Sequence, residues 1–174
     1  LFQAIKDSGI RVRTDFGNES PGWKFNEWEM RGVPIRIEVG PRDLENNQVV
    51  IARRDSGEKQ PLPIDQLVEQ LPVLLEDIQK QLFVKAKRFQ EDHSHYDIES
   101  LTALEERIAA MEAKNEVVGW VLAGWCGDET CEKQVQQQTH FTTRNIPFHP
   151  PQKKEKCLTC GAPAKHTVWF ARAY

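Results

Sequence analysis

Four cysteines stand in two closely spaced pairs in the last third of this chain of 174 residues. The first pair, in WCGDETCEKQ, encloses four residues, and the second pair, in KCLTCGAPAK, encloses two; a glycine follows one cysteine of each pair. Structural zinc is held tetrahedrally by deprotonated thiolates, and a tight turn with glycine can aim two of them at one ion. The spacing therefore predicts a closed, structural zinc site with the ligands Cys126, Cys131, Cys157 and Cys160.

Two disulfides are the main alternative, and they would suit a secreted protein. A redox-active pair at 157–160 is less favoured, because such pairs usually begin a helix, whereas Gly161 and Pro163 follow here. Three histidines lie near enough in the sequence to replace a cysteine ligand: His140, His149 and His166. We favour zinc, which would also stabilise a C-terminal unit with little apolar surface of its own.

A second group of polar side chains surrounds one predicted strand, in EWEMRGVPIRIEVGPRD at 27–43. It consists of Glu29, Arg36, Glu38 and Asp43, preceded by the aromatic residues Trp23, Phe25 and Trp28. Such groups can stack unpaired RNA bases and read their Watson–Crick edges. Guanine fits best, because its N1–H and amino group match a carboxylate and its O6 accepts from arginine or lysine. The alternative, which composition alone favours, is a solvated sheet face with weak salt bridges.

Strands and helices that would position these groups alternate along the first 90 residues. Residues 10–15 predict a short strand, 23–32 a helix that stops at a glycine, and 33–40 the clearest strand, with Arg36 and Glu38 on one face. After a polar connection, 49–55 predicts another strand. This order indicates an α/β layer structure.

Helical periodicity then predicts a long amphipathic helix from Asp65 to about Gln90, with Pro72 at a kink or in the first turn. The charged segment 91–99 is the best candidate for a linker. A capping-box spacing at 102–105 predicts another helix, and 166–174 alternates like a final strand.

Composition indicates a globular protein, with 39% hydrophobic residues and a net charge of −3. Neither half of the chain is strongly basic, so binding to nucleic acid by phosphate neutralisation alone is disfavoured. The longest apolar run, 117–125, is too short to cross a bilayer, and no membrane partner is predicted. The chain begins at Leu1 without a methionine, and we expect it to be a fragment.

The motif SPGWKFNEWEMRGVPIRIEVGPRDLENNQVVIARRD, together with WCGDETCE and CLTCGAPAKHTVWFARAY, closely resembles the C-terminal part of prolyl-tRNA synthetase of the archaeal and eukaryotic type. The resemblance implies a class II anticodon-binding domain at 1–90, with a mixed sheet flanked by helices. It also implies a linker at 91–99 and a small α+β zinc-binding domain at 100–174.

Enzymes of this family activate proline with ATP and Mg²⁺ and attach it to tRNA(Pro), so the resemblance implies a catalytic domain upstream, a homodimer and a cytoplasmic location. The anticodon of tRNA(Pro) has guanine at its second and third positions. Carried onto this sequence, the family pattern makes Glu29, Arg36 and Asp43 the leading guanine readers, with Glu38 and Lys59 as weaker candidates.

Two large aromatic residues, Phe25 and Trp28, are expected in the core rather than in base stacking. The terminal carboxylate of Tyr174 is implied to lie near the active site of the intact enzyme. Two rival functions stay open: an accessory or regulatory module that binds tRNA without charging it, and a structural zinc protein without an RNA function.

Overall fold

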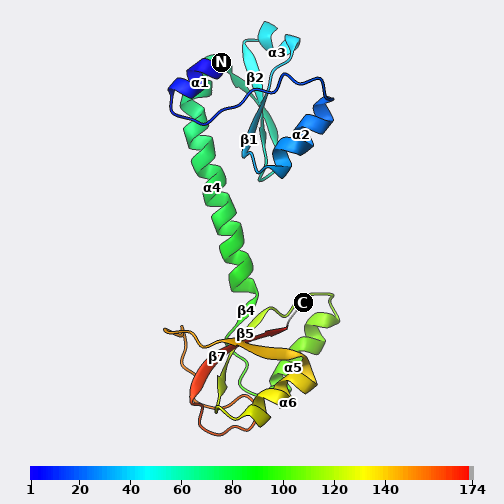
Figure 1. Ribbon diagram of the computed structural model, residues 1–174, viewed down its shortest axis with the longest axis vertical. Coiled ribbons are helices and arrows are strands. Elements are labelled where there is room, and N and C mark those ends of the chain that lie inside the picture. The colour runs from blue at the N-terminus through cyan, green and yellow to red at the C-terminus, as the bar shows by residue number, and fades with distance from the viewer. Residues whose placement is uncertain (173–174) are drawn as a thin grey trace. The chain divides into compact units, whose positions relative to one another are not determined.

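The structure, a computed structural model, describes residues 1–172. It contains two compact units, Leu1–Ala86 and a second that begins at Lys87. Their division falls inside the long helix α4 (Leu67–Asp92), drawn in green in Figure 1. The segment 91–99, predicted as a linker, holds the end of α4 and the short strand β4 (Ser94–His95). Within the described residues, no helix is both long and apolar enough to span a bilayer.

The first unit is built on an antiparallel sheet of three strands in the order β1-β2-β3. The strands are β1 (Ile35–Glu38), β2 (Gln48–Arg53) and β3 (Lys59–Pro63). The helices that precede α4 are α1 (Phe2–Asp7), α2 (Pro21–Met30), α3 (Pro41–Glu45) and the 3-10 helix η1 (Ile64–Gln66). Strand β2 lies in the centre, and its apolar residues Val49 and Ile51 are fully buried.

The core of the first unit forms where β2 meets α1 and the start of α4, around Ile5, Ile51 and Leu67. Ile35 and Ile37 of β1 pack against this core, whereas Arg36 and Glu38 alternate to the opposite face. The predicted two-face pattern of this strand is therefore confirmed. Ser20 caps α2, where its hydroxyl accepts from the backbone N–H of Trp23.

Several local predictions for the first unit are wrong. Residues 10–15 form no strand, and the polar connection after β1 contains the helix α3. Strand β3 was not predicted because Pro61 and Pro63 lack the N–H that a ladder needs, but an edge strand tolerates them. Of the two positions predicted for Pro72, the first turn of α4 is excluded, because Pro72 lies inside the helix, and the kink stays a prediction.

The second unit has a mixed sheet of four strands in the order β4-β5-β7-β6, in which β4 and β5 run parallel. Its remaining elements are α5 (Leu101–Glu112), β5 (Trp120–Trp125), α6 (Glu129–Thr139), β6 (Phe141–Asn145) and β7 (His166–Arg172). Helices α5 and α6 share one buried core with β5 and β7 (Figure 1). Both units thus agree with the predicted α/β class.

The N-terminus of α5 differs from the capping box predicted at 102–105. Ser100 is the N-cap, and its hydroxyl accepts from the backbone N–H of Ala103. Thr102 instead lies within the first turn. The apolar face of Leu101, Leu104 and Ile108 is the one that was predicted, so the helix was predicted correctly although its cap was not.

Candidate nucleic-acid interface and metal centre

The strand register of the first unit brings two distant cations onto the same face of the sheet. Ala52, at the centre, pairs with Arg36 of β1 on one side and with Lys59 of β3 on the other. Directly opposite residues of neighbouring strands project to the same face. Because Ala52 has only a methyl group, the long side chains of Arg36 and Lys59 can extend over it.

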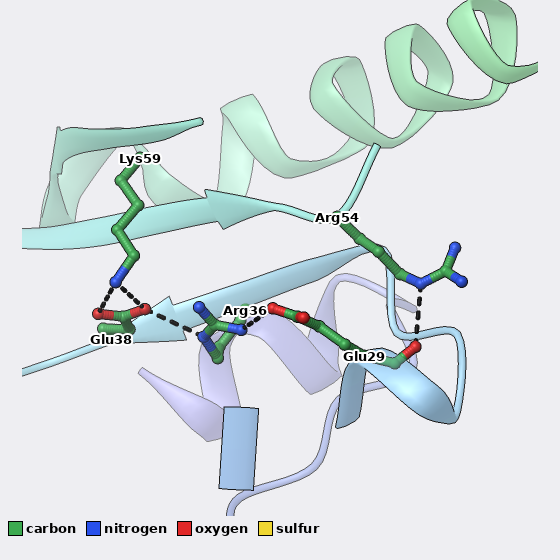
Figure 2. Close-up of polar contacts among 5 residues, drawn as sticks. All are labelled: Glu29, Arg36, Glu38, Arg54 and Lys59. Atoms are coloured by element: carbon green, nitrogen blue, oxygen red, sulfur yellow. Dashed lines mark hydrogen bonds and ion pairs between the residues drawn. The ribbon is translucent and has the colours of Figure 1, made fainter. Parts of the chain in front are cut away.

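These cations form a continuous chain of ion pairs with two carboxylates, which we call the charged row: Glu29, Arg36, Glu38 and Lys59 (Figure 2). The Arg36 guanidinium donates from Nη1 to Glu29 Oε1 at 2.7 Å and from Nε to Glu38 Oε1 at 3.0 Å. Lys59 Nζ lies 2.8 Å from Glu38 Oε1. Negative and positive groups therefore alternate along the row.

An aromatic ring lies beneath the centre of the charged row. The guanidinium carbon of Arg36 is 3.9 Å from the centroid of the Phe25 ring, and Lys59 Nζ is 5.2 Å from it. The expectation that Phe25 and Trp28 belong to the core is wrong, since α2 has no fully buried residue. Phe25 instead supports the charged row through cation–π contacts, which fix the plane of the guanidinium.

The two ends of the charged row are the accessible parts. The side chains of Glu29 and Lys59 are 52% and 49% exposed, against 18% for Arg36 and 23% for Glu38. Partial burial acts to raise the pKa of Glu38, but hydrogen bonds from Lys59 and Arg36 outweigh it and lower the pKa below its usual value. Glu38 is therefore an ionised acceptor at neutral pH.

Replacing Lys59 by methionine should raise the pKa of Glu38, because the substitution removes one donor and its positive charge. The lowered pKa means that this pairing stabilises the first unit above the unfolded-state pKa and is lost as the pH falls through the folded-state value. An NMR titration of the Glu38 carboxyl would measure the change, with Lys6→Met on α1 as the control. An unchanged Glu38 midpoint in Lys59→Met would contradict this pairing.

Asp43 is not part of the charged row, although it was predicted among the leading readers. Its Oδ2 accepts from the backbone N–H of Gly40 at 2.9 Å at the start of α3, and its Oδ1 accepts from Gln48 at 3.3 Å. Arg54 was not predicted, yet its Nε donates to the backbone carbonyl of Glu29 at 3.0 Å and fixes the end of α2 (Figure 2). Nothing in the sequence distinguished Arg54 from its neighbour Arg53 as a functional residue.

The four cysteines come together in the second unit, with all four sulfurs within 4.8 Å of one another. Cys126 follows β5, Cys131 lies in the first turn of α6, and Cys157 and Cys160 belong to the turn before β7. Zn–S bonds of about 2.3 Å at tetrahedral angles place sulfurs about 3.8 Å apart. The sulfurs of Cys126 and Cys160 are 3.9 Å apart, and all four thiols are free of disulfides.

The backbone next to the cysteines turns at two glycines, which suits a metal site with four protein ligands. Gly127 and Gly161 have φ values of +87° and +68°, in the region that favours glycine, as predicted. Burial acts to raise the pKa of Cys157, but backbone N–H groups, including those of Cys160 and Thr159, lower it, whereas burial raises the pKa of the neighbouring Cys131. The cluster thus has the separation, shape and donors that suit one tetrahedral metal ion.

Comparisons with known proteins agree with this two-unit description. The model for the family described as "Anticodon binding domain" matches residues 1–74, and that for "Prolyl-tRNA synthetase, C-terminal" matches 104–174. A proline–tRNA ligase of Symbiobacterium thermophilum is 59% identical over 174 residues, which are 100% of this chain and 36% of the relative. The chain belongs to the C-terminal region of the prolyl-tRNA synthetase family.

Two further relatives extend the prolyl-tRNA synthetase match. A proline–tRNA ligase of Alkaliphilus oremlandii is 47% identical over 100% of this chain and 35% of its own length. A crystal structure of prolyl-tRNA synthetase from Cryptosporidium parvum, complexed with L-proline and AMP, matches with a TM-score of 0.79 and 34% identity. It covers 99% of this chain and 36% of that protein. The chain thus spans about a third of the length of these relatives.

One predicted site residue lies outside the described residues. Tyr174, whose carboxylate the family resemblance places near the synthetic active site, follows the last described position, Arg172 in β7, by two residues.

Proposed function

We propose that this chain is the anticodon-binding part of a proline–tRNA ligase and that the charged row reads the two guanines of the tRNA(Pro) anticodon. The observation that carries the proposal is the assembly of alternating carboxylates and cations on one face of the matched anticodon-binding domain. Each neighbouring acid and base offers what one guanine edge needs. The carboxylate accepts from N1–H and the amino group, and the cation donates to O6.

Two such acid–base pairs are available for two guanines: Glu29 with Arg36, and Glu38 with Lys59. In the free protein they bond to each other, which keeps the charges satisfied in the absence of RNA. The half-exposed carboxylate of Glu29 and ammonium of Lys59 are the groups that a base reaches first. Asp43 is retained as a candidate reader, although its oxygens already accept bonds from the backbone and Gln48.

The wild-type chain is expected to bind an anticodon stem-loop of tRNA(Pro) at least about tenfold more tightly than one with both guanines changed to adenine. The estimate is conservative, since one good bidentate base contact is worth about 1–3 kcal/mol in DNA recognition. Adenine offers an amino donor where guanine has O6 and lacks the N1–H, so both members of each acid–base pair lose their partner. Titrations at one fixed salt concentration measure the ratio.

Equal affinity for both stem-loops would overturn the guanine-reading proposal. Changing a base pair in the stem provides the matched control, because it preserves the charge and length of the RNA. It should alter affinity far less than the anticodon change does.

We further propose that the four cysteines bind one zinc ion, which closes its coordination and has a structural role. The separation of their sulfurs supports this. By relation to the family, the full-length protein activates proline with ATP and Mg²⁺ and joins it to tRNA(Pro), as a cytoplasmic homodimer. These whole-protein properties rest on relatives about three times as long as this chain.

A further inference from the structure

A short loop before α2, Asp15–Phe16–Gly17, is fastened to that helix by a set of hydrogen bonds. The Asp15 carboxylate accepts from Trp28 Nε1 at 2.8 Å and lies 3.5 Å from Lys24 Nζ. Lys24 Nζ also donates to the backbone carbonyl of Gly17 at 2.7 Å and to that of Asp15 at 3.4 Å. We call this arrangement the loop clamp. In Figure 1 the dark-blue coil from α1 runs directly into α2.

The loop clamp leaves little freedom at its two ends. The backbone N–H of Gly17 donates to Asp15 Oδ1 at 3.0 Å, and a Cβ at Gly17 would lie 3.1 Å from that oxygen. The hydrogen bond from Trp28, followed by that from Gly17 and the charge of Lys24, lowers the pKa of Asp15. Asp15 therefore stays ionised at neutral pH, and the clamp persists there.

What the loop clamp holds in place is a phenylalanine ring that faces solvent. Phe16 is 89% exposed, although it lies between two anchored residues. Single exposed apolar residues are common on protein surfaces. The bonds of Asp15 and Gly17 fix the backbone on both sides of an exposed ring that adds no buried apolar area, so the packing of the first unit does not explain its position.

The loop clamp is joined to the charged row through α2. Trp28, which donates to Asp15, also lines a small surface cavity with Glu29 and Arg36. Lys24 and Trp28, which hold the loop, are one helical turn apart on α2. Phe25 and Glu29 are the residues that follow them, so they lie one turn apart on the neighbouring face of the same helix. Asp15 and Gly17, on either side of Phe16, are therefore bonded to the helix that also supplies Phe25 and Glu29 to the row.

We propose that Phe16 stacks on an unpaired RNA base that flanks the two guanines read by the charged row. This inference rests on the proposed function. The residues next to Phe16 in the sequence, in DFGNES, are polar or glycine, so the ring does not belong to a local run of apolar residues. A single flat ring suits a nucleobase, every one of which has a face for stacking. The contact adds affinity without choosing a base.

Phe16→Ala should weaken binding of the tRNA(Pro) anticodon stem-loop about 5- to 10-fold, within the range for loss of one base–aromatic stack. The preference for the guanine-containing loop over the adenine-substituted loop should stay the same, and the melting temperature should not fall, because the ring is exposed. Phe16→Trp should retain affinity. The matched control is Phe148→Ala, which removes a ring that is 99% exposed in the second unit.

Stem-loops with 2-aminopurine at one loop position outside the guanines provide a direct readout. Stacking on Phe16 should quench the fluorescence of one such base, and Phe16→Ala should restore it. Trp28→Phe leaves Phe16 unchanged and keeps an aromatic ring at position 28, but it removes the indole N–H that anchors Asp15. This variant should give an intermediate loss of quenching.

The outcomes separate this inference from the proposed function. If guanine discrimination is present but Phe16→Ala changes neither affinity nor fluorescence, the stacking inference alone is overturned. If the wild-type chain does not discriminate guanine from adenine, the proposed function fails and the inference fails with it. A lowered melting temperature with unchanged RNA affinity would assign Phe16 to folding and also overturn the inference.

Discussion

Removing zinc with a chelator, or replacing Cys157 by serine, should unfold the second unit while the first unit stays folded. The ligands come from three separate segments, so the ion would tie the ends of β5, α6 and the turn before β7 together. Structural zinc contributes about 10–16 kcal/mol to the folding of small zinc peptides. That is comparable with the entire stability of a typical domain, about 5–15 kcal/mol.

Hydrogen exchange resolved along the chain measures this effect. Amides of β5 and β7 should lose protection after zinc removal, whereas those of β2 should keep it, since all four cysteines belong to the second unit. His166→Ala is the matched control, because His166 neighbours the cysteine segment yet lies outside the predicted ligand set. The variant should retain one zinc per chain. Protein that contains no metal, two intact disulfides and a folded second unit would contradict the zinc proposal.

The cysteine cluster was predictable because its information is local. Each pair lies in one short segment, and the glycines that shape the two turns are next to the cysteines in the sequence. Only the approach of the two pairs to each other depended on the tertiary fold. Two closely spaced cysteine pairs are nevertheless typical of ligands that share one metal ion. The predicted set is the one that the structure brings within 4.8 Å.

The charged row was predictable only in part, since it depends on strand register. Arg36 and Glu38 alternate in one strand and were placed on one face correctly. Lys59 reaches Glu38 because β3 pairs with β2, and the prolines of β3 concealed that strand. Asp43 was included because it is close to β1 in the sequence and matches the family pattern, but the chain turns into α3 and uses its carboxylate at the start of that helix.

The role of Phe25 illustrates a different limit of sequence analysis. Large aromatic residues are usually buried, and this tendency predicted a core position. The helix α2 instead buries no residue completely, and the ring lies against a guanidinium that comes from the neighbouring strand. Such a contact joins residues 11 positions apart through tertiary packing, so helix periodicity alone does not reveal it.

Arg36→Ala should reduce the affinity for the tRNA(Pro) anticodon stem-loop by about 10- to 100-fold, within the range of about 1–3 kcal/mol for a bidentate base contact. Arg36 contacts both carboxylates of the charged row and the Phe25 ring, so its loss leaves Glu29 without its partner and Glu38 with Lys59 alone. Arg36→Lys should recover only part of the affinity, because an ammonium lacks the planar fork of a guanidinium.

A cycle that combines the protein and RNA changes distinguishes base reading by Arg36 from general attraction. If Arg36 reads guanine, the change from guanine to adenine should cost the Arg36→Ala variant much less affinity than it costs the wild type. Arg54→Ala is the matched control, since Arg54 carries the same charge nearby but donates to the Glu29 backbone carbonyl and not to a row carboxylate. It should lower affinity for both RNAs alike. Additive effects of Arg36→Ala and the base change would instead assign Arg36 to nonspecific phosphate attraction or to folding, because an interaction with the base necessarily appears as coupling between the two.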